Sequence, residues 1–281
     1  MHSARTDTVL VVGASSGFGA GVAAALLERG YTVYAAGRRL DRMQTLAARG
    51  AQVLRMDVTD AASVAAGVER IIAAQGRLDH VYANAGYGSY GMIESVSLEE
   101  VRRQYDVNVF GVGRVVQAVL PHMRSQRRGR IIITASVASH VAIAGMGWYA
   151  STKHALDGVA TALRQEVAHL GIDVVVIEPG MVQTEFDSVA LDTLKRTDHP
   201  EAYHRLVTGF RRFMEAGYAR GPGPERTVAA MVHAATARRP RRVYRTTMDA
   251  RTLPWLRTLL GGRLFYGIYL AWARSLAESG R

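Results

Sequence analysis

Short apolar runs recur along the first 180 residues, and longer stretches with helical periodicity separate them. Two of the runs, Val9–Val12 and Val174–Ile177, are apolar throughout. Continuous apolar runs are typical of strands buried on both faces of a parallel sheet. The pattern predicts six strands, at Thr8–Val12, Thr32–Ala36, Gln52–Met56, His80–Ala83, Arg130–Ala135 and Asp173–Ile177.

Helical patterns connect these strands. The predicted helices are Phe18–Arg29, Ala61–Gln75, Leu98–Met123 and Tyr149–Leu170. Strands that alternate with helices form βαβ units. The sequence therefore predicts an α/β fold, a doubly wound parallel sheet of the Rossmann type, in a single domain over residues 1–281.

The pattern is looser after Gly180. Residues 185–220 indicate one or two helices, which we interpret as a substrate lid, and another helix follows Pro224. A short strand is predicted near Arg242–Arg245. The C-terminal tail, residues 250–281, carries a helix or helix pair over Leu253–Leu276 that is broken near Gly261-Gly262.

The composition excludes several classes of protein. The 281 residues include no cysteine, so there is no disulfide and no thiolate metal site, and we expect no bound metal. The N-terminus lacks the apolar stretch of a signal peptide, and no apolar run reaches the roughly 18 residues of a membrane-spanning helix. We therefore expect a cytoplasmic protein.

The positive charge is confined to one end of the chain. Residues 1–204 hold equal numbers of acidic and basic side chains, so the net charge of +11 lies in residues 205–281. A charge placed this way indicates a local property of the C-terminal region. It argues against a nucleic-acid-binding protein.

A glycine-rich turn follows the first predicted strand. Its glycines, Gly13, Gly17 and Gly19, are spaced Gly-x3-Gly-x-Gly around Ser15, Ser16 and Phe18. Glycine allows a tight turn and a close approach to a pyrophosphate, and the following helix offers free amide groups to the phosphates. The turn predicts a dinucleotide site, although such a turn can also be purely structural.

The end of the second strand indicates which dinucleotide binds. An acidic residue there would bind a ribose 2′-hydroxyl, whereas arginine accommodates a 2′-phosphate. This strand runs into Arg38 and Arg39, and Asp41 is better placed to start the next helix. Arg38, supported by Arg39 and the Ser15 hydroxyl, predicts NADP(H) rather than NAD(H), unless it is one more solvated arginine of an arginine-rich chain.

Tyr149 and Lys153 are the strongest candidates for chemistry. Four residues apart on a helix, they share one face, so an ammonium lies beside a phenol. A nearby positive charge lowers a phenol's pKa and suits it to acid/base work near neutral pH. Only two residues of the chain, Lys153 and Lys195, are lysines beside 33 arginines, which indicates that position 153 needs a compact ammonium.

These motifs occur in the order found in one family. The glycine turn, Asn84-Ala85-Gly86, Asn108, Ser136, Tyr149-x3-Lys153 and the run Pro179–Thr184 follow one another along the chain. In this order and spacing the chain closely resembles the short-chain dehydrogenase/reductase family over about residues 6–186. The resemblance implies an NADP(H)-dependent oxidoreductase that interconverts a carbonyl and an alcohol.

The resemblance also implies roles for single residues. Tyr149 would exchange a proton with the substrate oxygen, Ser136 would hydrogen-bond that oxygen, and Lys153 would hold the nicotinamide ribose and lower the Tyr149 pKa. Asn108 would interrupt its helix and hold a water for proton relay. Further cofactor contacts are implied at Asp57, Val58, Asn84, Ala85, Gly86, Pro179, Gly180, Val182 and Thr184.

The substrate is expected to be apolar. Within the family the chain resembles the branch that contains hydroxysteroid and retinol dehydrogenases. The residues expected to line the substrate pocket are Tyr87, Tyr90, Ser136, Val137, Ile143, Met146 and Met181. The lid candidates are Phe186, Phe210, Phe213 and Met214, each of which could instead serve core packing.

The tail has more than one interpretation. Its run Leu264–Trp272 is apolar and aromatic and is flanked by Arg257, Arg263 and Arg274. Such a segment can bind a membrane surface, pack on the lid or pack on a second subunit. We expect a homo-oligomer and consider peripheral membrane contact.

Two other functions are compatible with the motifs. A non-catalytic NADP(H)-binding sensor or scaffold would keep the dinucleotide site, but such proteins usually lose the tyrosine or the lysine. A nucleotide-sugar epimerase or dehydratase shares the tyrosine–lysine pair, but its glycine motif is usually spaced differently and its substrate region is longer.

Overall fold

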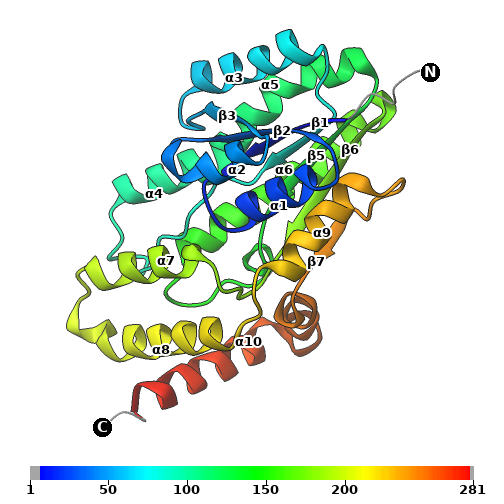
Figure 1. Ribbon diagram of the computed structural model, residues 1–281. Coiled ribbons are helices and arrows are strands. Elements are labelled where there is room, and N and C mark those ends of the chain that lie inside the picture. Colours follow the sequence, from blue (N-terminus) through cyan, green and yellow to red (C-terminus); the bar gives the residue numbers. More distant parts are fainter. Residues whose placement is uncertain (1–6, 279–281) are drawn as a thin grey trace.

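The computed structural model describes residues 7–278, and its centre is a sheet of seven parallel strands (Figure 1). The strand order is β3-β2-β1-β4-β5-β6-β7, so β1 lies between β2 and β4. The strands are β1 Thr8–Val12, β2 Thr32–Gly37, β3 Gln52–Arg55, β4 His80–Ala83, β5 Gly129–Thr134, β6 Ile172–Glu178 and β7 Val243–Arg245. The predicted strands and the doubly wound fold are confirmed, with strand ends shifted by one residue at most in β1 to β6.

Helices cover both faces of the sheet. On one face apolar side chains of α1 (Gly17–Leu27), α2 (Gln44–Ala48) and α9 (Glu225–Thr236) pack on the strands. On the other face α3 (Ala61–Gln75), α5 (Gly111–Gln126) and α6 (Gly147–Val167) do the same. The buried strands of the sequence pattern are thus enclosed between two apolar layers.

The long helix predicted over Leu98–Met123 is continuous but not uniform. It consists of α4 (Leu98–Tyr105), a π-helical segment η2 (Asp106–Phe110) and α5. A π segment adds a residue to a helical turn and is frequent at functional sites. Here it turns Asn108 toward the loop after β4.

Short 3-10 segments complete the chain. They are η1 (Asp41–Met43), η3 (Val137–Ser139), η4 (Ala168–Leu170) and η5 (Glu201–Tyr203). Asp41 starts η1, as the sequence predicted.

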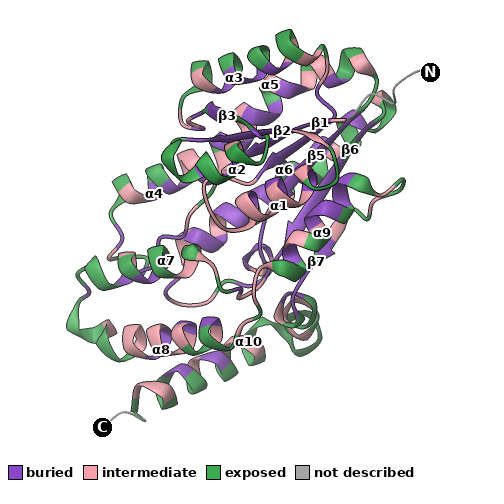
Figure 2. Cartoon of the chain, viewed as in Figure 1, coloured by how far each residue is buried: buried purple, intermediate pink, exposed green. Residues whose placement is uncertain are grey.

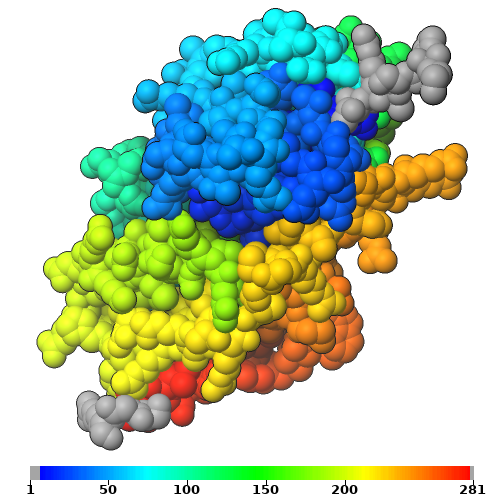
Figure 3. Space-filling view, viewed as in Figure 1, coloured from blue at the N-terminus to red at the C-terminus, as the bar shows by residue number. Residues whose placement is uncertain are grey.

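A third group of helices lies beyond the carboxyl ends of the strands. These are α7 (Glu185–Arg196), α8 (His204–Arg220) and α10 (Met248–Glu278) (Figures 1 and 2). Gly261 has φ 71° and ψ 154°, which only glycine adopts readily, and it divides α10 into two helices. The second half, coloured red, runs along α8, coloured yellow (Figure 3).

No helix within residues 7–278 is long and apolar enough to cross a membrane. Residues 1–6, where the sequence predicts no signal peptide, and the last three residues of the predicted tail lie outside the described part of the chain.

Candidate active site

One cavity of about 1060 Å³ opens at the carboxyl ends of the strands. The strand order reverses between β1 and β4, and an open α/β sheet forms a crevice at such a point. Nearly all predicted catalytic, cofactor and substrate residues line this one cavity. Lid candidates aside, the two exceptions are Gly19 and Asn108, which are absent from the lining.

The turn between β1 and α1 requires its three glycines. Gly13 has φ 81°, and a Cβ there would stand 2.8 Å from the Ala85 Cα. Gly17 has φ 53°, and a Cβ on Gly19 would stand 2.1 Å from the Gly13 carbonyl oxygen. A Cβ at Gly13 or Gly19 would therefore collide with neighbouring backbone atoms. The turn places the N-terminal amide groups of α1 at the cavity, where they would bind a phosphate.

Asn84 holds this turn against the neighbouring strands. Its Nδ2 donates to the Gly13 carbonyl at 3.3 Å, and its Oδ1 accepts from the Thr134 Oγ1 at 3.0 Å. One side chain at the end of β4 thus connects the ends of β1 and β5. The position suits a structural role for Asn84 on the floor of the dinucleotide half.

Two arginines stand where the sequence placed the selector for the cofactor. Arg38 and Arg39 follow β2, are exposed and line the cavity. The Arg39 guanidinium donates to the Ser15 Oγ at 3.1 Å. Asp57, across the same region, has a lowered pKa because hydrogen bonds from Thr59 and the charge of Arg38 together outweigh the effect of burial. Both guanidiniums and the Ser15 hydroxyl therefore form one polar corner.

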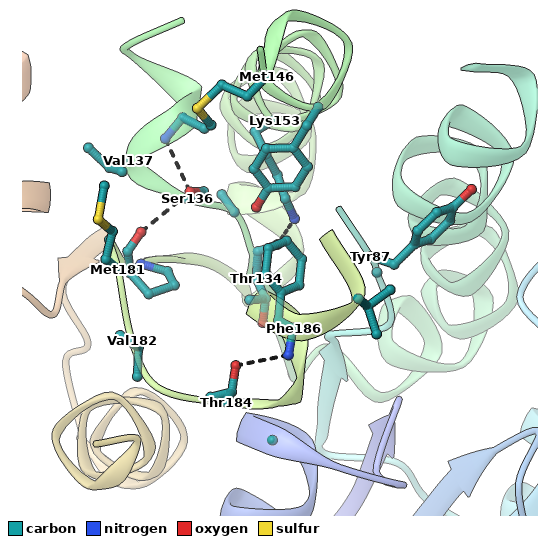
Figure 4. A pocket seen from close by; sticks show the side chains of 18 of the residues that line it. Tyr87, Thr134, Ser136, Val137, Met146, Lys153, Met181, Val182, Thr184 and Phe186 are labelled. Atoms are coloured by element: carbon teal, nitrogen blue, oxygen red, sulfur yellow. Dashed lines mark hydrogen bonds between the residues drawn. The ribbon is translucent and has the colours of Figure 1, made fainter. Parts of the chain in front are cut away.

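Ser136, Tyr149 and Lys153 line the same cavity, and Figure 4 shows Ser136 and Lys153 among its side chains. All three are buried. The Ser136 Oγ accepts from the Ala138 amide at 3.1 Å and contacts the Pro179 carbonyl at 3.4 Å. The Lys153 Nζ lies 5.7 Å from the centre of the Tyr149 ring and donates to the Thr134 carbonyl at 2.9 Å. The spacing on α6 thus places the ammonium beside the phenol, as predicted.

The pKa of Tyr149 departs from the expectation drawn from the sequence. Burial raises the pKa of the phenol above its ordinary value, and the Ser136 hydroxyl lowers it by a smaller amount. We expected a net lowering by Lys153. The reason for the difference is that Tyr90 and Phe186 enclose the Tyr149 ring, with centroids 5.9 and 5.4 Å away, and exclude water from it.

Asn108 fixes the loop after β4. Its Nδ2 donates to the Tyr87 carbonyl at 2.9 Å, and its Oδ1 accepts from the Tyr87 amide at 3.0 Å. A Cβ on Gly86 would stand 3.2 Å from this Oδ1 and 3.9 Å from the Lys153 Nζ. The π segment therefore brings Asn108 next to the lysine, and its role in a proton relay stays a prediction.

The substrate half of the cavity is apolar. Nine of the ten other residues that the sequence assigned to this half line it, and they are Tyr87, Tyr90, Val137, Ile143, Met146, Met181, Phe186, Phe213 and Met214. Phe210 does not line it, because its ring packs behind Tyr90 at 5.5 Å. The Tyr87 hydroxyl donates to Glu100 and points away from Ser136 (Figure 4), so only the rest of that residue faces the cavity.

The sequence did not identify two contributors to the site. The first is the apolar side of α10, which lines the cavity with Leu253, Leu256, Leu260, Phe265, Ile268, Tyr269 and Trp272. The start of α10 also holds the loop after β6, since the Met181 amide donates to the Asp249 Oδ2 and the Gly180 amide to the Thr247 Oγ1, each at 2.9 Å. Of the alternatives for the tail, the structure shows packing on the lid.

Lys153 should make the stability of the protein depend on pH. Burial lowers the pKa of its ammonium to about 8, whereas an unfolded lysine titrates near about 10.4. Between these values the unfolded chain binds more protons, so this group makes the folded state more stable as pH rises. We expect the free energy of unfolding of the wild type, relative to Lys153→Met, to rise by up to about 3 kcal/mol from pH 8 to 10.4.

Denaturant melts over this pH range measure the effect. Lys195→Met is the matched control, since it makes the same substitution at an exposed position of α7. A flat difference for Lys153→Met would show that the Lys153 pKa is not lowered by the fold.

No group of three or more histidine, aspartate or glutamate side chains is positioned to hold a metal ion within the described residues.

A family model described as short chain dehydrogenase matches residues 7–194. The chain is 31% identical to an uncharacterized oxidoreductase, YbbO, of Escherichia coli K12, over 92% of this chain and 91% of the relative. It is 34% identical to the 3-ketodihydrosphingosine reductase of Bacteroides thetaiotaomicron, over 84% and 86%. It is 30% identical to human retinol dehydrogenase 8, over 92% and 86%.

Solved structures share the whole architecture. A short-chain dehydrogenase from Streptomyces avermitilis superposes with a TM-score of 0.80 at 28% identity, covering 92% of this chain and 96% of that one. A short-chain dehydrogenase/reductase from Burkholderia phymatum, in complex with NAD, superposes with a TM-score of 0.78 at 26% identity, covering 92% and 95%.

Proposed function

Because this chain belongs to the short-chain dehydrogenase/reductase family of oxidoreductases, we propose that it interconverts a carbonyl and an alcohol with NADP(H), on a lipophilic substrate. One observation carries the proposal. Ser136, Tyr149 and Lys153 share a single cavity with the glycine turn, and apolar side chains such as Met146, Phe186 and Met214 line much of the rest of that cavity. A protonated phenol and a hydroxyl therefore face the space where a dinucleotide and an apolar substrate would meet.

The residues of the chain divide the work. A bound nicotinamide would give a hydride to the substrate carbon, or take one from it. The Ser136 hydroxyl would hydrogen-bond the substrate oxygen as negative charge develops there. The Tyr149 phenol, protonated because it is buried, would donate its proton to that oxygen in reduction and recover it in oxidation. Lys153 would then stabilise the phenolate that forms.

The polar corner at Arg38 and Arg39 supports NADP(H). No acidic residue directly follows β2, and two guanidiniums and the Ser15 hydroxyl face the region where a 2′-phosphate would bind. The Asp57 carboxylate lies across the same region, where the charge of Arg38 stabilises its ionised form. The structural relative from Burkholderia phymatum contains NAD and that from Thermococcus sibiricus contains 5-hydroxy-NADP, so the shared fold accommodates either dinucleotide.

Arg38→Asp should change the preference for the cofactor. The variant loses a partner for the 2′-phosphate and offers an acceptor to a 2′-hydroxyl. We expect the ratio of kcat/KM for NADPH to that for NADH to fall by about a hundredfold or more. Arg55→Asp, the same charge change at the exposed end of β3, should leave the ratio unaltered. An unaltered ratio in Arg38→Asp would remove Arg38 as the selector.

The apolar lining favours a lipophilic substrate. Met146, Met181, Met214 and Phe186 line the cavity, and the Phe186 ring lies 5.4 Å from that of Tyr149. Among the described residues, the arginines in the lining are Arg38, Arg39 and Arg103. Two relatives are named for retinol and 3-ketodihydrosphingosine, which are both lipids. A panel of steroid, long-chain and short water-soluble ketones, followed by NADPH absorbance, tests the class of substrate.

We further propose that the protein is a cytoplasmic homo-oligomer that touches membranes through its tail. The tail's exposed apolar side chains and its arginines support that contact. The alternative is a non-catalytic NADP(H)-binding sensor or scaffold. It is less well supported, because Ser136, Tyr149 and Lys153 line one cavity and Asn108 lies close to Lys153.

A further inference from the structure

The two helices of α10 carry an exposed apolar row. Trp255, Leu259 and Leu264 are 63%, 64% and 54% exposed, and none of them lines the cavity. Leu260, Ile268 and Trp272 are exposed as well, but these three also line the cavity. The apolar surface of the cavity is thus continuous with an apolar outer surface.

The inward side of the same segment is well anchored. Tyr269 donates to the Ala144 carbonyl at 3.1 Å, and its ring packs edge-to-face on Phe213 at 5.8 Å. Trp272 packs on Phe213 in the same way, at 4.9 Å. The second half of α10 therefore lies along α8 (Figure 1), while Leu264 and Ile268 are exposed to solvent. The exposed row is a feature of the folded protein rather than of a loose end.

Exposed arginines occur on both halves of α10, three of them beside the row and Arg257 on the opposite face from Trp255 and Leu259. Arg251, Arg257, Arg263 and Arg274 are all exposed along α10. The acidic side chains of α10 are Asp249, which binds the Met181 amide, and Glu278, which pairs with Arg205. An apolar row edged by arginines matches the surface of an anionic bilayer, where guanidiniums meet phosphates and apolar side chains enter the acyl region.

The kink is placed at the mouth of the cavity. Gly261 joins the two halves of α10, and a Cβ there would meet nothing within 4 Å. A small hollow beside it is lined by Leu260, Leu264 and Ile268, among others. The bend brings the apolar side chains of both halves to one opening.

We infer that α10 is a membrane-docked portal, through which a lipophilic substrate passes from an anionic bilayer directly into the cavity. The inference rests on the proposed function, since it needs a substrate that dissolves in lipid. The outer row and the arginines bind the bilayer surface. Leu260, Ile268 and Trp272 then form a passage that is apolar on both sides, so the substrate avoids water.

A bilayer explains the surface better than a second copy does. Two-fold pairing of this row would bring the three arginines beside it in one α10 near the same three of the other. Like charges at short range repel one another, whereas an anionic surface attracts all of them. The charge therefore selects lipid over self-association.

Vesicle binding tests the docking step. The full chain should sediment with vesicles that contain phosphatidylglycerol and not with pure phosphatidylcholine, and high salt should release part of it. Leu259→Ser with Leu264→Ser should weaken binding by about tenfold or more, because both side chains leave the acyl region. The matched control is Leu98→Ser with Val159→Ser, two exposed aliphatic residues of α4 and α6, which should bind as the wild type does.

Turnover tests the portal. We call the Leu259→Ser with Leu264→Ser protein the outer-row variant. With a long-chain ketone supplied in anionic vesicles, its rate should be about tenfold lower than that of the wild type. With a short water-soluble ketone its rate should equal that of the wild type, because neither leucine lines the cavity.

The portal would be overturned if the Leu259→Ser with Leu264→Ser variant and the Leu98→Ser with Val159→Ser control reduced the ketone in vesicles at equal rates. Failure of the wild type to bind any vesicle, with an oligomer that the outer-row variant dissociates, would assign the row to a second copy. If the wild type binds vesicles but reduces no ketone, the proposed function fails instead.

Discussion

Tyr149→Phe should lower kcat by about a thousandfold and leave NADPH binding nearly unchanged, because it removes only the transferable proton of a general acid. The ring itself remains, so its contacts with Tyr90 and Phe186 are kept. Steady-state rates with any accepted ketone, together with NADPH titration by fluorescence, separate the two effects.

Tyr203→Phe is the control for this variant. It removes one phenolic hydroxyl that donates to Glu94 away from the cavity, so its rates should match those of the wild type. A Tyr149→Phe protein that keeps more than a small fraction of the wild-type rate would show that another group handles the proton.

Lys153→Arg should be almost as damaging, although the charge is kept. The ammonium is buried and donates to the Thr134 carbonyl at 2.9 Å, close to Gly86 and Asn108. A planar guanidinium is larger and needs a different arrangement of acceptors. We expect kcat/KM to fall by about a hundredfold or more, as reacting groups move out of position.

The second lysine of the chain provides the control. Lys195→Arg makes the same substitution at an exposed position of α7 and should change neither rate nor stability. Normal activity in Lys153→Arg would mean that position 153 supplies charge alone, and the rarity of lysine in this chain would then have no mechanistic meaning.

The architecture could be predicted because it depends on local patterns. Apolar runs such as Val9–Val12 are buried on both sides of the sheet, and the glycine spacing from Gly13 to Gly19 fits one kind of turn. The break in the tail could also be predicted, because the sequence has a glycine pair there. Gly261 indeed adopts a conformation that few other residues tolerate.

The features that the sequence did not reveal depend on contacts between distant segments. The resemblance implied that Asn108 interrupts its helix, and the structure has a π segment there. The local pattern does not contain its partner, the Tyr87 backbone, 21 residues earlier in the chain. The raised Tyr149 pKa comes from burial by Tyr90 and Phe186, which a pattern on α6 alone does not contain. The contribution of α10 to the cavity follows from its packing on α8, and apolar helical residues do not indicate their partner.

One measurement shows directly whether this cavity catalyses hydride transfer between NADP(H) and a carbonyl carbon. The protein is incubated with NADPH that carries deuterium at the transferable position and with the ketone panel, and the alcohols are analysed by mass spectrometry. We predict an alcohol with one deuterium on its carbinol carbon, formed by the wild type and about a thousandfold more slowly by Tyr149→Phe. Tight NADPH binding with no labelled alcohol from any ketone, in either variant, would contradict such catalysis and favour a sensor or scaffold.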